Sequence, residues 1–138
     1  MDLSPHENLL IQQSFAELDS HGEGFAHYFF DLLFQMAPLV KPMFKSERNL
    51  VEHHFYEVFS TAVIKINQTD ELEPTLLKLG ARHTTYGVKE EHFKIVRTAL
   101  LLSIEFILAN RCNEHILSAW GKYFDYLASV MCRGMAGT

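Results

Sequence analysis

Residues 79–96, LGARHTTYGVKEEHFKIV, contain the histidine around which the rest of the chain can be interpreted. His83 ends a line of apolar side chains, because Leu72, Leu76, Leu79 and His83 follow one another at intervals of four, three and four residues. Such intervals place side chains on one face of an α-helix. A lone histidine on an apolar face is more often a structural residue that bonds a backbone carbonyl than a ligand, so its position alone leaves its role open.

The remainder of the chain is predicted to be helical, because apolar residues recur with helical spacing and strand-like alternation is absent. Gly22 and Gly24 separate the first two helices, Pro38 ends the second, and Gly87 ends the helix that carries His83. The predicted helices cover about residues 4–18, 25–37, 51–66, a shorter helix between 70 and 87, then 90–107 and 113–131, and the tail RGMAGT is expected to fray. The predicted fold class is therefore all-α.

The length and composition predict one globular domain, residues 1–138, which is long enough to bury a core without disulfides. The formal charge of −5, without a cluster of Lys or Arg, argues against nucleic acid or an anionic membrane as the main partner. Eleven Phe residues suggest that a wide apolar surface has to be lined.

The sequence also suggests a cellular setting. Two cysteines, Cys112 and Cys132, cannot form a framework of bridges, and the N-terminus MDLSPHENLL lacks the pattern of a secretory signal. The longest apolar stretch, residues 99–109, is interrupted by Ser103 and Glu105 and is far shorter than the roughly 20 residues of a membrane span. We therefore expect a cytoplasmic protein that contacts no membrane.

Two stretches, APLVKPMF at residues 37–44 and the stretch 79–96, resemble bacterial single-domain haemoglobins and the globin domain of flavohaemoglobins. The resemblance extends over essentially the whole chain, and Pro38, Phe44 and His83 have the order and separations found in globins. It implies a globin fold, a helical sandwich around a haem pocket, with haem b (iron protoporphyrin IX) as the cofactor.

By this resemblance, His83 is the proximal iron ligand, Phe44 stacks on the porphyrin, and Pro38 begins the short helix before the haem pocket. Neutral imidazole is a good ligand for haem iron. Val88 resembles a haem-packing residue, although plain core packing is almost as well supported. Arg82 could pair with a haem propionate, or be an exposed arginine without such a role.

The opposite, distal side departs from the usual globin pattern. By ungapped counting from Phe44, Val51 stands where many globins have a distal His or Gln, Phe55 lies one turn further, and Phe30 replaces a common Tyr. These apolar residues alone would hold O₂ poorly, because bound O₂ is retained better where a donor points at it. His53 and His54 are the two candidates for a donor or a sixth iron ligand. His54 is the better one, because it lies three residues after Val51 on the same side of the helix, whereas His53 lies two residues after it and points roughly the opposite way. An exposed His54, or one paired with a propionate, is the alternative.

The proximal side lacks two residues that polarise the proximal histidine in flavohaemoglobins. Phe93 stands in place of a Tyr, and Met135 in place of a Glu. Since a polarised imidazole favours oxygen activation, their loss favours ligand binding over dedicated catalysis.

The function implied is reversible binding of O₂, CO or NO, with His54 as a candidate internal sixth ligand. A second hypothesis is NO dioxygenation with an external reductase that restores ferrous iron. The third is a haem-free, globin-like signalling module, which the large Phe30 and Phe55 would favour and the presence of His83 disfavours.

Overall fold

The computed structural model describes residues 3–137, which contain helices and turns and no strand. Its elements are α1 (Pro5–Asp19), α2 (Gly24–Met36), the 3₁₀ helix η1 (Pro38–Met43), α3 (Arg48–Ile64), α4 (Thr69–Thr85), α5 (His92–Leu108), the 3₁₀ helix η2 (Ala109–Arg111) and α6 (Glu114–Ala136). The predicted all-α class is confirmed. No helix among the described residues is both long enough and apolar enough to cross a membrane.

Local sequence accounts for the helix ends. The Ser4 hydroxyl accepts the backbone N–H of Glu7 while the Glu7 carboxylate accepts that of Ser4, a reciprocal pair that starts α1. Asn113 caps α6 in the same manner, accepting the backbone N–H of Ile116. At Ala37 the backbone leaves the helical region, as expected for the residue before Pro38.

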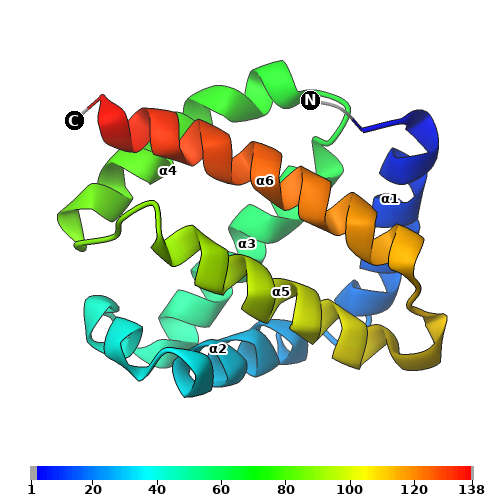
Figure 1. Ribbon diagram of the computed structural model, residues 1–138, viewed down its shortest axis with the longest axis horizontal. Helices are drawn as coiled ribbons and strands as arrows, with labels where there is room; N and C mark the ends of the chain where they lie inside the picture. The colour runs from blue at the N-terminus through cyan, green and yellow to red at the C-terminus, as the bar shows by residue number, and fades with distance from the viewer. Residues whose placement is uncertain (1–2, 138) are drawn as a thin grey trace.

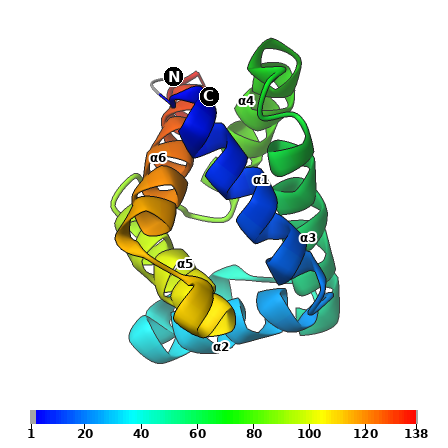
Figure 2. The ribbon, with the colours of Figure 1, turned by 90° about the vertical axis from the view of Figure 1, so that its right-hand side faces the viewer.

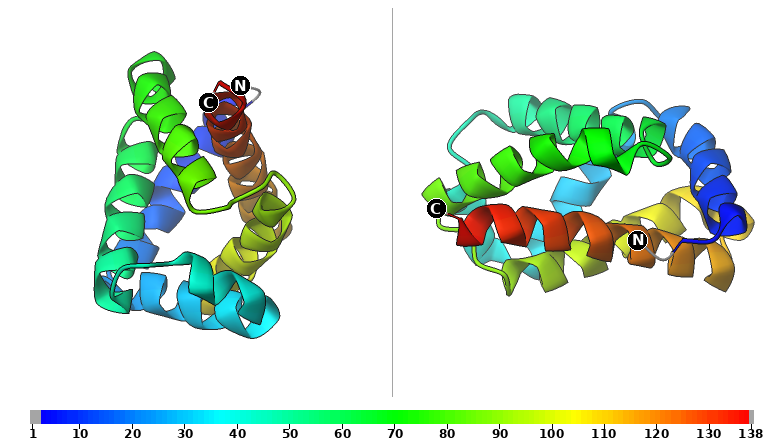
Figure 3. Two further views of the ribbon diagram at one scale, coloured as in Figure 1. Left: turned by 90° about the vertical axis from the view of Figure 1, so that its left-hand side faces the viewer. Right: turned by 90° about the horizontal axis from the view of Figure 1, so that it is seen from above.

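The helices form two layers that cross (Figure 1). Helix α4 packs mainly on α6, and α2 packs on α5 and α3. Figure 2 shows α2 across the base of the molecule, with α5 and α6 rising on one side and α3 on the other. Helix α3 does not pack closely along α4, although the two are consecutive in the chain. Figure 3 shows both helices from the side and from above, with α2 running across the end of the molecule where α3 starts.

The part of the core between α1, α2, α3 and α6 is aromatic. Trp120 of α6 is 2% exposed, and its indole N–H donates to Ser14 Oγ of α1 at 2.9 Å. Phe59 of α3 stacks on Trp120 with 5.3 Å between ring centroids, and Phe25 of α2 lies 5.2 Å from Phe59. This arrangement fixes α1, α2, α3 and α6 relative to one another.

Two glycines allow α4 and α6 to approach closely. A Cβ built on Gly80 of α4 would overlap the backbone of Met131, and one built on Gly134 of α6 would overlap the backbone of Leu77. No side chain fits at either position unless the helices move apart. These glycines therefore determine how α4, the helix of His83, sits on α6.

The sequence predictions for the helix ends need three corrections. The tail does not fray, because α6 continues to Ala136 and Gly134 is buried against α4. Helix α4 has 17 residues and is as long as α3 rather than shorter. Ile66 is buried but lies beyond the end of α3 at Ile64. Met1, Asp2 and Thr138, which the predicted domain includes, lie outside the described residues. That residues 1–138 form one domain stays a prediction.

Candidate functional site

His83 lies in the last turn of α4, where its ring is partly buried. Its Nδ1 is 2.7 Å from the backbone carbonyl oxygen of Leu79, one turn earlier in the same helix. A carbonyl oxygen can only accept, so Nδ1 carries the proton and donates it. The other ring nitrogen, Nε2, then keeps its lone pair and is free to bind a metal.

The surroundings of His83 favour the neutral imidazole. Burial lowers the pKa of His83 below its ordinary value, the hydrogen bond to Leu79 acts in the opposite direction, and the charge of Arg82 lowers the pKa further. Because metal ligation needs a neutral imidazole, the lowered pKa allows His83 to bind a metal at lower pH.

The turn after α4 brings the His83 end of the helix to η1. Gly87 has a φ of +84°, which a glycine adopts without strain, and the Val88 N–H donates to the His83 carbonyl oxygen at 3.2 Å. A Cβ on Gly87 would lie 3.9 Å from the side chain of Met43, the residue before Phe44. Figure 1 shows this turn next to η1 at the same end of the molecule. The predicted residues Phe44, His83 and Val88 thus belong to one end of the fold.

An aromatic cluster joins α2, η1 and α3 at this end. Phe30 is 3% exposed, and its ring centroid lies 5.6 Å from that of Phe44 and 5.4 Å from that of Phe55. Phe55 also stacks on Phe29 at 4.6 Å, so its ring is held against α2. Phe44 is 38% exposed, although an aromatic ring is normally covered. The cluster therefore leaves part of an apolar surface open.

The other predicted site residues are half-buried or exposed. Val51 of α3 and Val88 are half-buried. His54 is exposed, with its ring centroid 6.3 Å from that of His53. His53 is also exposed and binds the carboxylates of Glu23 and Glu57, so it is engaged away from the core. Arg82 is exposed at the end of α4.

Phe93 and Met135, which replace the polarising residues of flavohaemoglobins, are both half-buried. Phe93 has no group that could accept a proton from His83. The hydrogen bond that orients the His83 ring is the one to Leu79 within its own helix.

Sequence reasoning missed a charged group between α2 and α3. We call it the Glu52 cluster, and it consists of His27, Asp31, Arg48 and Glu52. Glu52 is 8% exposed, and its Oε2 accepts from Arg48 Nε at 2.6 Å and His27 Nδ1 at 2.9 Å. Although burial acts in the opposite direction, the hydrogen bonds to Glu52 and Asp31 raise the pKa of Arg48. The spacing of Arg48 and Glu52 was visible in the sequence, but an i, i+4 pair usually lies on a solvated face.

The residues at this end fit a haem. The donor set supplies one neutral imidazole nitrogen on α4, and haem needs one such proximal ligand from the protein. On the α2 and α3 side, Phe55 is half-buried and Phe44 is 38% exposed, and both lie against the buried ring of Phe30. Haem, a flat and largely apolar group whose iron takes a ligand from the protein, matches this combination.

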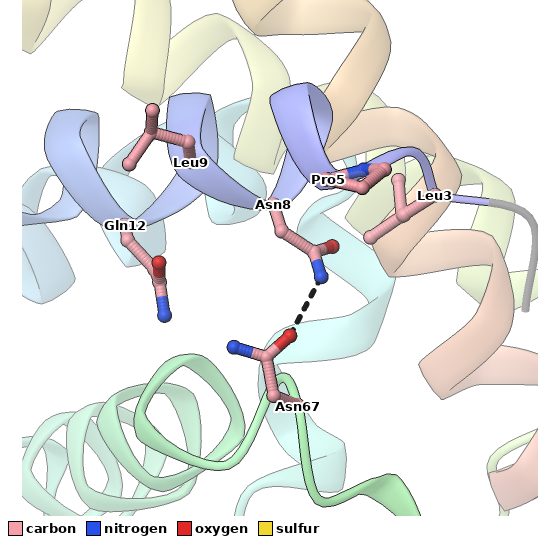
Figure 4. Close-up of a pocket in the computed structure, with 6 residues that line it drawn as sticks. All are labelled: Leu3, Pro5, Asn8, Leu9, Gln12 and Asn67. Carbon is pink, nitrogen blue, oxygen red and sulfur yellow. Dashed lines mark hydrogen bonds between the residues drawn. The ribbon is translucent and has the colours of Figure 1, made fainter.

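A separate shallow hollow lies where α1 meets the connection between α3 and α4 (Figure 4). Its lining residues are Leu3, Pro5, Asn8, Leu9, Gln12 and Asn67. Asn8 Nδ2 donates to Asn67 Oδ1 at 2.8 Å across it. None of these residues is ionisable, and the hollow lies at the opposite end of α3 from Val51. We assign no function to it.

Comparisons with known proteins identify the family to which the chain belongs. The family model described as Globin matches residues 27–131. The chain is 30% identical over 137 residues to anaerobic nitrite reductase NSHB5 of Oryza sativa subsp. indica, covering 95% of this chain and 94% of that protein. It is 28% identical to the flavohemoprotein of Bacillus subtilis (strain 168), covering 88% of this chain and 31% of that longer protein.

Among solved structures, a bacterial globin from Campylobacter jejuni superposes with a TM-score of 0.83 and 25% identity, covering 97% of both chains. The relatives thus include plant as well as bacterial proteins, so the bacterial branch expected from the sequence stays a prediction. The matched residues run from α2 to α6 and include both the aromatic cluster and His83. With its fold, its histidine and its relatives in agreement, this chain belongs to the globin family.

Proposed function

We propose that this globin binds haem through His83 and uses it to bind a diatomic gas, O₂, CO or NO, reversibly. The observation that carries the proposal is the hydrogen bond from His83 Nδ1 to the Leu79 carbonyl oxygen, since it leaves Nε2 as the metal-binding nitrogen. Haem iron supplies the position at which the gas binds. The chain supplies a neutral ligand on one side and an apolar surface on the other.

All the predicted residues except His54 have a role in this proposal. Phe44 packs on the porphyrin, and Val88 covers its edge on the His83 side. Arg82, exposed one residue before His83, is available to a haem propionate. Phe30, Val51 and Phe55 form the surface that faces the gas. Because none of these three side chains has a hydrogen-bond donor, the gas is held by the iron and by apolar contact, which favours CO and NO over O₂.

Haem b is the form we propose, because both cysteines lie outside the segments that carry the predicted site. Cys112 precedes α6, Cys132 lies in α6, and both are free. Their free state agrees with a reducing, cytoplasmic setting. A haem-free role is less well supported. The large Phe55 ring stacks on Phe29 and is therefore held on the α2 side.

A second candidate is an enzymatic reaction of a nitrogen oxide. The rice relative is named as a nitrite reductase, and the Bacillus relative is a flavohemoprotein. One-electron reduction of nitrite consumes two protons and gives NO and water, whereas dioxygenation of NO consumes O₂ and gives nitrate. Each reaction leaves oxidised iron, so each needs an external reductase as partner.

The test is the absorption spectrum of the purified chain, expressed with ample haem, in its ferric, ferrous and ferrous-CO forms. We expect an intense Soret band that shifts on reduction and again with CO. His83→Ala should lose haem or change its ligation, while the control His115→Ala, an exposed histidine in the first turn of α6, should keep the wild-type spectrum.

Two results would contradict the proposal. One is a wild-type chain that shows no Soret band and takes up no added haemin. The other is a His83→Ala variant whose spectra equal those of the wild type in all three forms. For the second candidate, anaerobic ferrous protein mixed with nitrite should release NO, and the absence of NO would exclude nitrite reduction.

A further inference from the structure

We propose that the Glu52 cluster, which joins α2 to the first turns of α3, sets the rotation of α3 about its own axis and so keeps His54 away from the iron. Arg48 and Glu52 are then positioning residues of the gas-binding side. This inference rests on the proposed binding of haem through His83.

The cluster connects the two helices by several hydrogen bonds at once. Glu52 receives one bond from within α3, from Arg48, and one from α2, from His27. The Arg48 guanidinium donates in turn to two acceptors on α2, the His27 carbonyl oxygen at 3.0 Å and Asp31 Oδ1 at 2.6 Å. Because Glu52 is 8% exposed, it cannot exchange these partners for water without leaving the interface. The start of α3 is therefore fixed against α2.

Helix geometry relates this contact to His54. Successive residues of an α-helix are separated by about 100° around its axis. Taking Val51 as the centre of the gas-facing side, Glu52 lies about 100° to one side and His54 about 60° to the other. Moving His54 to the centre requires α3 to turn by about this 60°, which carries Glu52 away from α2. The Glu52 cluster therefore cannot stay intact while His54 occupies the centre of the gas-facing side.

The same arginine also contacts the aromatic cluster. Arg48 lies with its guanidinium carbon 5.7 Å from the ring centroid of Phe34. The Phe34 ring lies 5.7 Å from that of Phe30 and 5.5 Å from that of Phe44. A rotation of α3 would also separate Phe55 from Phe29, which it stacks on. Charged and aromatic contacts therefore oppose the same movement.

Glu52→Gln tests the proposal, because it keeps the side-chain shape and removes the charge. Glu57→Gln is the matched control, since Glu57 is also a carboxylate of α3 that binds a histidine but lies on the surface. We expect the reduced wild type and Glu57→Gln to have five-coordinate haem, and Glu52→Gln to gain the sharp bands of six-coordinate, low-spin haem. If the five-coordinate fraction falls to about a tenth, the apparent affinity for CO falls about tenfold.

A double variant identifies the added ligand. Glu52→Gln combined with His54→Ala should return to the five-coordinate spectrum. Asp31→Asn removes the negative charge from one acceptor of Arg48 on a more exposed side chain, so it should act in the same direction but more weakly. This variant replaces Glu52→Gln as the test if Glu52→Gln does not fold.

Three results would overturn the inference. They are unchanged coordination in both Glu52→Gln and Asp31→Asn, six-coordinate bands that persist in the double variant, and a wild type that is already six-coordinate until His54 is replaced. A wild type that takes up no haem would overturn the proposed function itself. Haem uptake with any of the three results would overturn the role of the cluster alone.

Discussion

Gly80→Ala should destabilise the protein by moving α4 away from α6. A Cβ at this position would lie 2.7 Å from the Met131 carbonyl carbon and closer still to its oxygen. Bringing the carbonyl carbon alone to an ordinary separation of about 3.4 Å takes a movement of about 0.7 Å, and the closer oxygen requires a larger one. Since backbone yields less than a flexible side chain, we take the upper part of the usual overpacking range, about 3 kcal/mol.

Helix propensity partly offsets this strain. Alanine is favoured over glycine inside a helix by about 1 kcal/mol, which leaves a net loss of about 2 kcal/mol. For a chain of 138 residues, a loss of that size lowers the melting temperature by about 8 °C. Gly134→Ala should behave similarly, and the double variant should lose less than the sum, because one separation of the helices relieves both overlaps.

Thermal unfolding of the apoprotein, followed by far-ultraviolet circular dichroism, measures this effect. Gly24→Ala is the control, because a Cβ at Gly24 meets nothing within 4 Å. It should melt at or slightly above the wild-type temperature. If Gly80→Ala were as stable as Gly24→Ala, the crossing of α4 and α6 would not depend on glycine, and the reasoning would be refuted.

Two further effects follow from buried polar groups. Burial lowers the pKa of His83, so below about pH 6.5 the unfolded chain binds more protons than the folded one, and the unfolding free energy of the apoprotein should decrease as the pH falls. His83→Gln should flatten this part of the pH profile in urea titrations, and an unchanged slope would show that His83 is not the source of the pH dependence. The pKa of His53 is raised by Glu23, so His53 acts with the opposite sign, and it does so equally in the wild type and in His83→Gln. Ser14→Ala should leave the indole N–H of Trp120 without its acceptor and lower the free energy of unfolding by about 1–3 kcal/mol. The loss should appear as a lower urea midpoint at constant m-value. A midpoint shift no larger than that of an exposed serine variant would show that water replaces the hydroxyl.

The candidate site could be proposed from sequence because Pro38, Phe44 and His83 have the order and separations found in globins. The roles of Phe44 and His83 come from that resemblance, and the structure brings their two segments together through the turn at Gly87. The helical face that carries His83 could also be predicted, since Leu72 and Leu76 of that face are buried. Iron ligation by His83 itself stays a proposal.

Other features could not be predicted because they depend on which helices cross. The sequence shows Glu52 as a charged residue in an amphipathic helix, where a solvated position is the ordinary expectation. Only the packing of α2 on α3 makes it a buried acceptor. Likewise, the glycine at position 134 suggested a fraying tail, yet it is needed where α6 contacts α4.

By itself, the sequence determined the helices and their approximate ends, because these depend on local properties: helical periodicity, capping side chains, and breaks at proline and glycine. The proposed proximal role of His83 came from the resemblance of the sequence to globins. The tertiary structure decided the partial burial of His83, the burial of Glu52 and the exposure of His54. The physical reason is that burial and hydrogen bonding depend on partners distant along the chain, whose approach is set by how the helices cross.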